Sequence, residues 1–384
     1  MVGFPAWVAG LVAPGDATGA ACLTRADPCL PEGEWQVLKR VLARVGTVLV
    51  ALVVTLALWT WLSPWPSVLL IRAMWPEATT EQEQAMEALR PAGISAQHDV
   101  VVDATDPDGS IDIYRPEAAV EAALPTIVWV HGGGFVTCTK NGMDTYLDHI
   151  AAAGFTVVAV EYTVAPNAQY PRPVQQVTRA VDFLVTHAQE YGVDPDQMVL
   201  AGDSAGAHIA AQTAMAIAQP GYSEDAGLDL PELSDIQANS DLQATVLYSG
   251  AFDMTLMKSS EGMGRWMVQT MLWAYTGSKD PASDPHLEWA SLPQHVDSDF
   301  PSSFISTGPA DPLLSHSESM ADHLEAQGVQ VDTLWFPDAP DTIGHEYQMD
   351  LRTPQAKESM KALLAFLRTH LDTPVPLEAP ADLW

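Results

Sequence analysis

The sequence predicts an α/β domain with a mostly parallel central sheet flanked by helices. Apolar, strand-like runs at 156–161, 198–201 and 244–249 alternate with helix-like runs at 174–188 and 205–216. Such alternation is typical of parallel strands joined through helices. With 384 residues the chain is long enough for one such domain of usual size together with a separate N-terminal segment.

An antiparallel hairpin is expected at one edge of the sheet. The runs 100–102 and 111–114 flank the turn dipeptide Asp108-Gly109. Further along, residues 219–241 are polar and acidic, which predicts a surface insertion between elements of the sheet.

The front of the chain predicts a membrane anchor over residues 45–71. No charged residue lies between Arg44 and Arg72. A helix of 18–20 such residues spans about 27–30 Å, close to the hydrocarbon thickness of a bilayer. The cluster Trp59, Trp61 and Trp65 at its far end is typical of an interfacial aromatic belt.

The basic residues before the anchor predict its orientation. Lys39, Arg40 and Arg44 precede it, and acidic residues follow Arg72. Positive-inside bias therefore favours a cytoplasmic, largely disordered arm over residues 1–44 and an extracytoplasmic domain over residues 72–384. A cleaved signal peptide and an interfacial helix of a soluble protein are the alternatives to a span.

The most informative motif is Gly202-Asp203-Ser204-Ala205-Gly206, which follows an apolar strand and opens an Ala-rich helix. This order is typical of a nucleophile elbow, a tight turn that exposes a serine at a helix N-terminus. A second motif, His131-Gly132-Gly133-Gly134-Phe135, follows the strand-like run 126–130. Consecutive glycines let backbone N–H groups face a cavity, as an oxyanion hole requires.

A serine nucleophile needs a base and an acid that orients the base. Asp311 follows the strand-like run 303–307, and His345 follows it by 34 residues in a second post-strand loop. We assign these two residues as acid and base. Asp253, Asp338 and Asp341 compete for the acid. On the helix expected after Asp311, His316 and His323 are interpreted as surface positions.

These motifs together resemble the bacterial hormone-sensitive-lipase family of α/β-hydrolases over roughly residues 95–372. The resemblance extends through Glu161-Tyr162-Thr163-Val164-Ala165-Pro166, Tyr170-Pro171-Arg172-Pro173 and Asp311-Pro312-Leu313. It departs from the family pattern at three positions, which are Glu161, Ala207 and the sequence His345-Glu346-Tyr347.

Membership would imply an α/β-hydrolase fold and hydrolysis of small carboxylic esters without cofactor or metal. It assigns Ser204 as nucleophile, His345 as base and Asp311 as its orienting carboxylate. By the same resemblance the N–H groups of Gly132, Gly133 and Ala205 form the oxyanion hole, while Phe135, Tyr162 and Trp273 line the substrate pocket.

The resemblance also implies a helical cap, expected from residues 76–95 and 254–286. The second segment contains Met263, Trp266, Met267, Met271 and Trp273, which repeat with the spacing of an amphipathic helix. We expect one side of this helix to be buried and the other to line an acyl pocket, for which adaptable methionines are suited.

Composition excludes several other functions. A net charge of −32 leaves no basic patch for nucleic acid. Residues 103–109 only weakly resemble a calcium loop. The 3 cysteines, Cys22, Cys29 and Cys138, do not form a disulfide framework, and Cys138 is expected to be a packing residue.

Two alternatives remain open at this point. An amidase or peptidase would use the same serine machinery, since the leaving group is selected by pocket geometry. A non-catalytic ligand-binding protein of the same fold is the other alternative, although such proteins usually lack one member of the triad. The acyl length and the oligomeric state do not follow from the sequence.

Overall fold

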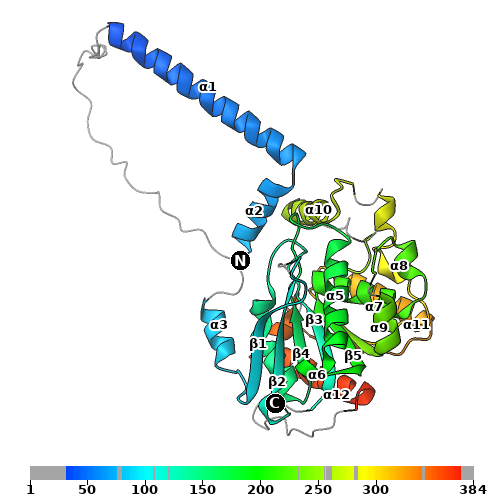
Figure 1. Ribbon diagram of the computed structural model, residues 1–384. Coiled ribbons are helices and arrows are strands. Elements are labelled where there is room, and N and C mark those ends of the chain that lie inside the picture. Colours follow the sequence, from blue (N-terminus) through cyan, green and yellow to red (C-terminus); the bar gives the residue numbers. More distant parts are fainter. Residues whose placement is uncertain are drawn as a thin grey trace. The chain divides into compact units, whose positions relative to one another are not determined.

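The computed structural model describes residues 32–75, 80–106, 109–119, 122–231, 233–254, 256, 262–280, 284–339 and 342–372 (Figure 1). The chain divides into two compact units, Met1–Leu58 and Trp59–Trp384, which are described separately. The second unit contains the sheet and the two glycine-rich motifs at residues 131–135 and 202–206, so it contains the candidate site.

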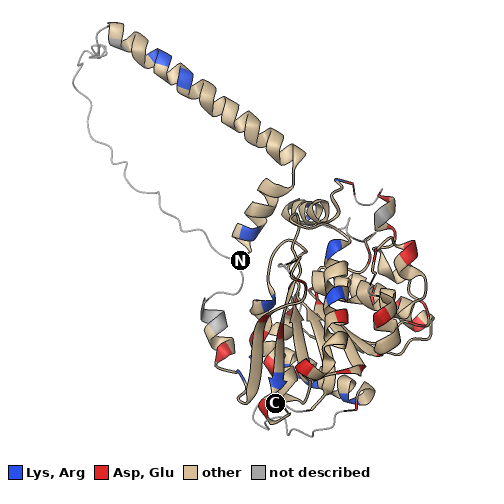
Figure 2. Ribbon diagram, in the orientation of Figure 1, with Lys and Arg blue, Asp and Glu red and all other residues tan. Residues whose placement is uncertain are grey.

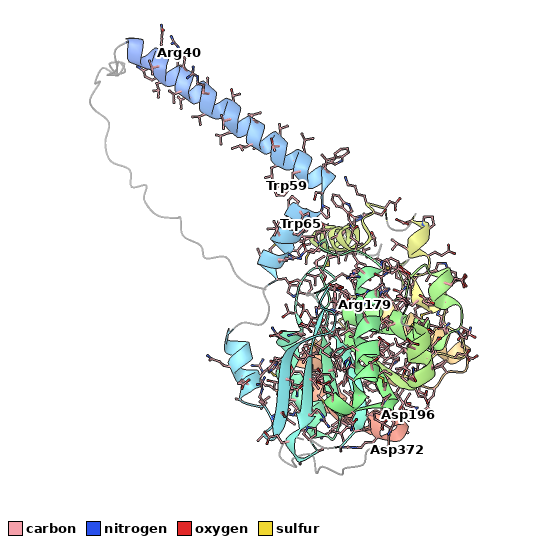
Figure 3. All side chains as sticks on the ribbon, viewed as in Figure 1. Arg40, Trp59, Trp65, Arg179, Asp196 and Asp372 are labelled. Carbon is pink, nitrogen blue, oxygen red and sulfur yellow. The ribbon has the colours of Figure 1, made fainter. Side chains whose placement is uncertain are left out.

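In the described residues the first unit consists of helix α1 (Glu32–Leu62), whose last residues fall in the second unit. Within its segment Trp35–Leu62 an 18-residue window has a mean hydropathy of 2.4, none of the segment is buried, and by length and composition it could cross a membrane. Basic residues occur only in its N-terminal part (Figure 2). Figure 3 shows Arg40 near one end of this helix and Trp59 near the other.

The helix differs from the expected boundaries at both ends. Residues 32–44, interpreted from the sequence as part of a disordered arm, form the first turns of α1, whereas residues 1–31 lie outside the described part of the chain. At the other end α1 stops at Leu62, because Pro64 disfavours a helical Ser63. A new helix, α2 (Trp65–Met74), then begins. The expected anchor 45–71 is therefore two helices.

An eight-stranded sheet forms the centre of the second unit, in the order β1-β2-β4-β3-β5-β6-β7-β8. The first two pairings, β1 with β2 and β2 with β4, are antiparallel, and all the others are parallel. The strands are β1 (Ile94–Val101), β2 (Ser110–Pro116), β3 (Leu124–Val130), β4 (Thr156–Val160), β5 (Val193–Asp203), β6 (Leu242–Tyr248), β7 (Ser302–Ser306) and β8 (Val331–Leu334). Both the mostly parallel sheet and the expected edge hairpin are confirmed.

Helices cover both faces of the sheet (Figure 1). They are α3 (Thr80–Glu87), α4 (Asp144–Ala152), α5 (Arg172–Thr186), α6 (Ala188–Tyr191), α7 (Ala205–Ala218), α8 (Tyr222–Asp225), α9 (Leu233–Asn239), α10 (Gly262–Thr276), α11 (Leu314–Ala326) and α12 (Pro354–His370). The expected insertion 219–241 contains α8 and α9, and Ile236 of α9 is fully buried, so part of this segment belongs to the core.

The two cores follow from the alternation of side chains along each strand. In β3, Val128 and Val130 pack with α5, α7, α9 and α11, while Ile127 and Trp129 pack with α4 and α12. Every residue of β3 is buried, and all of them except Thr126 are apolar, as expected for a strand that is covered on both faces. This packing fixes the carboxyl ends of β3, β5 and β7, where the candidate site lies.

Two helices near these strand ends pack against each other, α2 and α10. Val68 and Ile71 of α2 are fully buried and belong to the same core as Met271 and Tyr275 of α10. The expected cap segment 76–95 is placed differently, because Met86 and Leu89 pack with the core of α4 and α12. Residues 76–79, 255, 257–261 and 281–283 of the expected cap lie outside the described residues.

Candidate active site

Ser204 stands on a strained turn between β5 and α7. Its backbone has φ 52° and ψ −120°, a conformation that non-glycine residues rarely adopt and that is found at nucleophile elbows. Only glycine fits at the flanking positions 202 and 206, because a Cβ there would collide with backbone atoms. A Cβ at Gly202 would lie 2.6 Å from the carbonyl carbon of Gly206, and one at Gly206 would lie 2.1 Å from the Val130 carbonyl oxygen.

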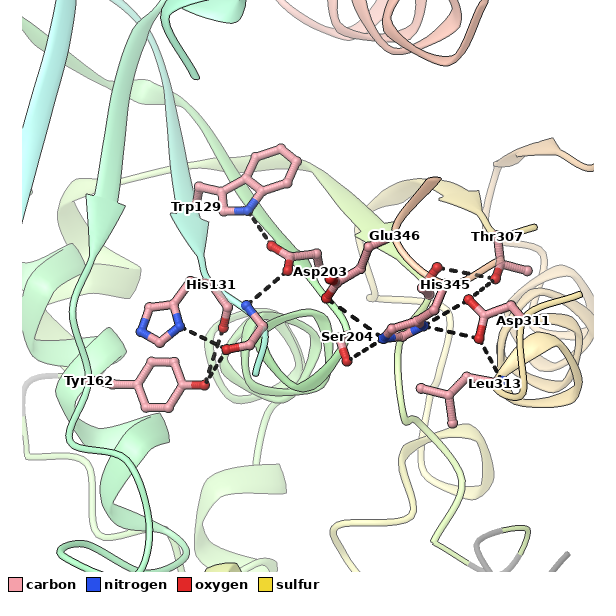
Figure 4. Close-up of polar contacts among 12 residues, drawn as sticks. Trp129, His131, Tyr162, Asp203, Ser204, Thr307, Asp311, Leu313, His345 and Glu346 are labelled. Carbon is pink, nitrogen blue, oxygen red and sulfur yellow. Dashed lines mark hydrogen bonds and ion pairs between the residues drawn. The ribbon is translucent and has the colours of Figure 1, made fainter. Parts of the chain in front are cut away.

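The three side chains expected to form a triad meet at the carboxyl ends of their strands (Figure 4). His345 Nε2 lies 2.9 Å from Ser204 Oγ, which is hydrogen-bonding distance. On its other side His345 Nδ1 lies 3.0 Å from both carboxylate oxygens of Asp311. This geometry lets the imidazole accept the serine proton through Nε2 while Asp311 fixes its orientation.

Asp311 is held by two further donors. Thr307 Oγ1 donates to Oδ2 at 2.6 Å, and the backbone N–H of Leu313 donates to Oδ1 at 2.8 Å. Burial raises the pKa of this carboxyl, but the hydrogen bonds from His345 and from these donors outweigh burial, so the pKa is lowered. Asp311 is therefore a fixed carboxylate beside the imidazole.

Glu346 brings a second carboxyl to the imidazole. Its Oε1 lies 3.7 Å from His345 Nε2, on the side of Ser204 (Figure 4). Burial lowers the pKa of His345, but the hydrogen bond with Asp311 and the charges of Glu346 and Asp311 outweigh it and raise the pKa to about 9. The site thus strongly stabilises an imidazolium, the species that forms when the serine loses its proton.

The glycine loop after β3 is supported from behind. Tyr162 stacks on His131 at a centroid distance of 4.3 Å, and its hydroxyl donates to the carbonyl oxygens of His131 and Gly132 at 3.2 and 3.3 Å. Arg72 of α2 donates through Nε to the carbonyl oxygen of Val136 at 2.7 Å. The loop is therefore held in one conformation by side chains outside the cavity.

The amide of Gly132 is not available to an oxyanion. It donates to Asp203 Oδ2 at 2.9 Å, so the sequence-based assignment of this residue to the oxyanion hole is wrong. Gly133, Gly134 and Ala205 line the cavity, and their N–H groups have no hydrogen-bond acceptor within the described part of the chain. A Cβ at Gly133 would lie 2.1 Å from the Thr137 carbonyl oxygen, so this turn requires glycine.

Asp203, the residue before the nucleophile, is a buried carboxyl that the sequence motif alone did not assign. Trp129 Nε1 donates to its Oδ1 at 2.8 Å, and Gly132 occupies Oδ2. Burial and the nearby carboxyl of Glu346 raise its pKa well above the usual value. Burial and the neighbouring carboxyl thus favour the protonated form of Asp203.

Next to Ser204 lies a cavity of about 320 Å³, within the range of small-molecule sites. Phe135 lines it and stacks on Tyr275 at a centroid distance of 4.0 Å. Tyr162 and Trp273 are not among its lining residues. Most of the wall is apolar. The part that comes from α10 and the segments beside it consists of Trp75, Leu256, Gly264, Met267, Val268, Met271 and Leu272.

The sequence also offered other candidates for the acid and two histidines on α11, and none of those that the structure describes takes part in the hydrogen bonds that join the triad. Asp253 accepts hydrogen bonds from Ser291 and Gln294 and lies away from His345 Nδ1, which Asp311 occupies. His316 is 2% exposed and lines the cavity, so its interpretation as a surface residue was wrong. His323 is exposed as expected. Asp338 is exposed, and Asp341 lies outside the described residues.

The remaining expectations concern cysteine and metal. Cys138 is not part of a disulfide within the described chain, and it lines the cavity beside Gly133. Cys22 and Cys29 lie outside the described residues. In the weak calcium-like loop, Asp106 is paired with Arg179 and accepts a hydrogen bond from Gln176 at 3.0 Å. Among the described residues no group of three His, Cys, Asp or Glu side chains could hold a metal ion.

Comparison with protein families places residues 127–343 in a family described by the α/β-hydrolase fold. An esterase of Gibberella moniliformis is 26% identical over 67% of this chain and 79% of its own length. An acetyl esterase of Salmonella paratyphi B is 25% identical over 60% of this chain and 68% of its own. A probable carboxylic ester hydrolase of Mycobacterium tuberculosis, LipM, is 27% identical, and the match covers 53% of this chain and 45% of the relative.

Solved structures share the same fold. Esterase B from Lactobacillus rhamnosis superposes with a TM-score of 0.66 and 20% identity over 80% of this chain and 94% of its own. A bacterial heroin esterase superposes with a TM-score of 0.61 and 23% identity over 80% of this chain and 98% of its own.

Proposed function

The chain belongs to the hormone-sensitive-lipase family of α/β-hydrolases, and on this premise we propose that it is a serine carboxylesterase. The observation that carries the proposal is the contact of His345 Nε2 with Ser204 Oγ at 2.9 Å, with Asp311 on the opposite nitrogen. Relatives named as esterases support carboxylic esters as the substrate class.

In the first half-reaction Ser204 Oγ bonds to the ester carbonyl carbon, and its proton passes to His345 Nε2. The carbonyl oxygen becomes an oxyanion within reach of the amides of Gly133, Gly134 and Ala205. One well-placed donor of this kind lowers the barrier by about 3–4 kcal/mol. The carbon–oxygen bond to the alcohol then breaks, and the alcohol leaves with the proton from His345.

The second half-reaction repeats these steps with water. His345 removes a proton from water as it bonds to the acyl carbon, and the collapse of the second oxyanion releases the carboxylic acid and restores Ser204. Throughout, Asp311 keeps Nε2 directed at the serine. The apolar cavity beside Ser204 accommodates an acyl chain of short to medium length, since its volume of about 320 Å³ lies at the small end of ligand sites.

We also propose that α1 anchors the chain as a single span, with a cytoplasmic N-terminus and the catalytic unit outside. The support is the apolar segment Trp35–Leu62, none of which is buried, and the position of Lys39, Arg40 and Arg44 in the first turns of the same helix.

The catalytic proposal is tested with p-nitrophenyl acetate and p-nitrophenyl butyrate. We expect Ser204→Ala to lower kcat by at least about 10⁴-fold, as loss of a triad nucleophile does. Ser315→Ala, an exposed serine on α11, is the matched control and should keep full activity. A fluorophosphonate probe should label the wild type and the control but not Ser204→Ala. Equal activity of all three proteins would exclude the mechanism.

A further inference from the structure

The second unit concentrates its exposed apolar side chains on one surface. From residue 65 onward, the large apolar residues that the described chain leaves exposed are Leu69, Leu70, Met74, Trp75, Val101 and Met263. All except Val101 belong to α2, to α10 or to Trp75, which follows α2 directly. These five residues are called the cap surface. A surface of this kind on an otherwise polar domain marks an interaction site.

Both faces of α2 are apolar, which a helix on a water-exposed surface does not require. Val68 and Ile71 are fully buried, while Leu69, Leu70 and Met74 on the opposite face are 50%, 51% and 47% exposed. An amphipathic surface helix would carry polar residues at those exposed positions. The buried face is satisfied by the core, so the outer face needs a different apolar partner.

The charge of this surface differs from that of the rest of the protein. The chain has a net charge of −32, yet α2 and α10 contain no acidic residue (Figure 2). Their charged residues are Arg72 and Arg265, of which Arg265 is exposed. An anionic lipid surface would repel most of this acidic protein, and the cap surface is the part that could approach lipid without this repulsion.

The position of the cap surface in the chain favours a bilayer as its partner. The apolar helix α1 ends at Leu62 and α2 begins at Trp65, so only Ser63 and Pro64 separate them. Two extended residues reach about 7 Å. If α1 spans a membrane, α2 must therefore start at the membrane surface. Lys279 also lies over the ring of Trp61 at 4.5 Å and over that of Trp273 of α10 at 4.6 Å.

The cap surface is continuous with the cavity beside Ser204. Trp75 is 40% exposed and also lines the cavity, and Gly264, the residue after Met263, lines it too. The same two segments thus present apolar side chains to the outside and form the apolar wall within. An ester whose acyl chain already lies in lipid could enter along them without exposing that chain to water.

We propose that the cap surface docks on the lipid bilayer and that the enzyme takes bilayer-resident amphiphilic esters through it. This inference rests on the proposed esterase function for its substrate class. The docking rests on the cap surface and on the proposed membrane span of α1, and it does not require catalysis. The docking claim and the substrate claim can therefore be tested, and can fail, separately.

The test uses the full chain reconstituted in phosphatidylcholine vesicles. The double variant Leu69→Gln/Leu70→Gln and the single variant Met263→Gln make the cap surface polar without touching the triad. Val101→Gln is the control, because Val101 is 53% exposed and lies in β1. Each protein is assayed on soluble p-nitrophenyl acetate and on 4-methylumbelliferyl octanoate dissolved in the vesicles, whose medium-length acyl chain suits the cavity beside Ser204.

We expect all variants to hydrolyse p-nitrophenyl acetate as the wild type does. The double variant should lose about tenfold in rate on the vesicle-borne octanoate ester, since two leucines no longer partition into lipid. Val101→Gln should lose nothing. Equal rates of wild type and double variant on the octanoate ester would overturn the substrate claim.

A depth measurement decides the docking independently of any catalysis. Bimane is attached at Leu70→Cys or at Val101→Cys, in a background with Cys22, Cys29 and Cys138 replaced by serine. Brominated lipids should quench the label at 70 strongly and the label at 101 weakly. Equal, weak quenching at both positions would overturn docking. A mass measurement that shows a wild-type dimer and a monomeric double variant would also overturn it, because the surface would then belong to a second copy of the chain.

Discussion

Glu346 makes the electrostatics of the catalytic imidazole unusual. Asp311 contacts His345 Nδ1, and the Glu346 carboxyl lies 3.7 Å from Nε2, so negative charge faces both ring nitrogens. The pKa of His345 is raised to about 9 by the Asp311 hydrogen bond and by the charges of both carboxyls, against the opposing effect of burial. Only the neutral ring can accept the serine proton. At neutral pH the His345 ring must therefore lose a proton in most of the resting enzyme before the reaction can start.

This arrangement predicts the pH dependence of the reaction and its change in Glu346→Gln. Because the pKa is raised, kcat/KM should increase as pH rises, with the midpoint of the rise near pH 9. Removing one negative charge within 4 Å of the ring should lower the midpoint of this rise by about one pH unit and increase the rate at neutral pH. The measurement is kcat/KM for p-nitrophenyl acetate against pH, with Glu318→Gln, an exposed residue on α11, as control. An unchanged midpoint in Glu346→Gln would contradict the assigned electrostatics.

At the same scale the sequence identifies side chains better than backbone amides. Ser204, Asp311 and His345 follow from motifs that end strands, and the structure brings them together. The bond from the Gly132 amide to Asp203 joins residues 71 positions apart, so no local pattern shows that this glycine is already occupied. The burial of His316 likewise depends on Asp253, whose amide donates to its Nδ1 at 3.1 Å from another loop.

The helix α10 lines the cavity beside Ser204, which we propose to be the acyl site. Met271 is 9% exposed and lines the cavity, and its sulfur is the atom nearest to a Cβ built on Gly134, at 2.7 Å. The side chain therefore fills the space between the cap and the glycine loop. Flexible methionines adapt to irregular gaps, which suits a wall that accepts different acyl chains.

Shortening this side chain should change both specificity and stability. Met271→Ala should shift the preference from acetate toward longer p-nitrophenyl esters, because the cavity deepens, and should destabilise the protein by about 2–5 kcal/mol. Met263→Ala is the matched control on the same helix, since Met263 is 64% exposed and should change neither property for soluble esters. The measurements are kcat/KM across an acyl series and thermal unfolding. An unaltered acyl profile in Met271→Ala would remove α10 from the specificity wall.

At the scale of helices and strands, those with a regular apolar pattern could be predicted from the sequence. The residues at which a helix starts or is interrupted could not. The alternation of apolar runs predicts the parallel strands, and the apolar stretch after Arg44 predicts most of α1. The start of α1 at Glu32 and the separate α2 depend on helix termini, where sequence signals are weakest. The packing of Met86 and Leu89 with the core of α4 and α12 is a tertiary contact that no local pattern reveals.

At the scale of the whole molecule, basic and acidic residues are unevenly distributed along the chain. The chain has 17 basic and 49 acidic residues, and Lys39, Arg40 and Arg44 lie together in the first turns of α1. The orientation of a membrane span is set mainly by the basic residues within about 15–20 residues of its ends, which stay on the cytoplasmic side. Acidic residues contribute little. The orientation of the anchor should therefore depend on these three positions and not on the large negative charge of the catalytic unit.

This predicts the outcome of a charge reversal in Lys39→Glu/Arg40→Glu/Arg44→Glu. In intact cells that express the wild type, the catalytic unit should be cleaved by added protease and should hydrolyse a membrane-impermeant ester. The triple variant should lose most of both signals, and cell lysis should restore them. The same reversal on α12, at Lys357, Lys361 and Arg368, changes the net charge equally but lies far from α1 in sequence, so it should leave both signals intact. Protection of the wild-type catalytic unit from external protease would reverse the proposed orientation, and equal loss in both triple variants would attribute the effect to charge alone.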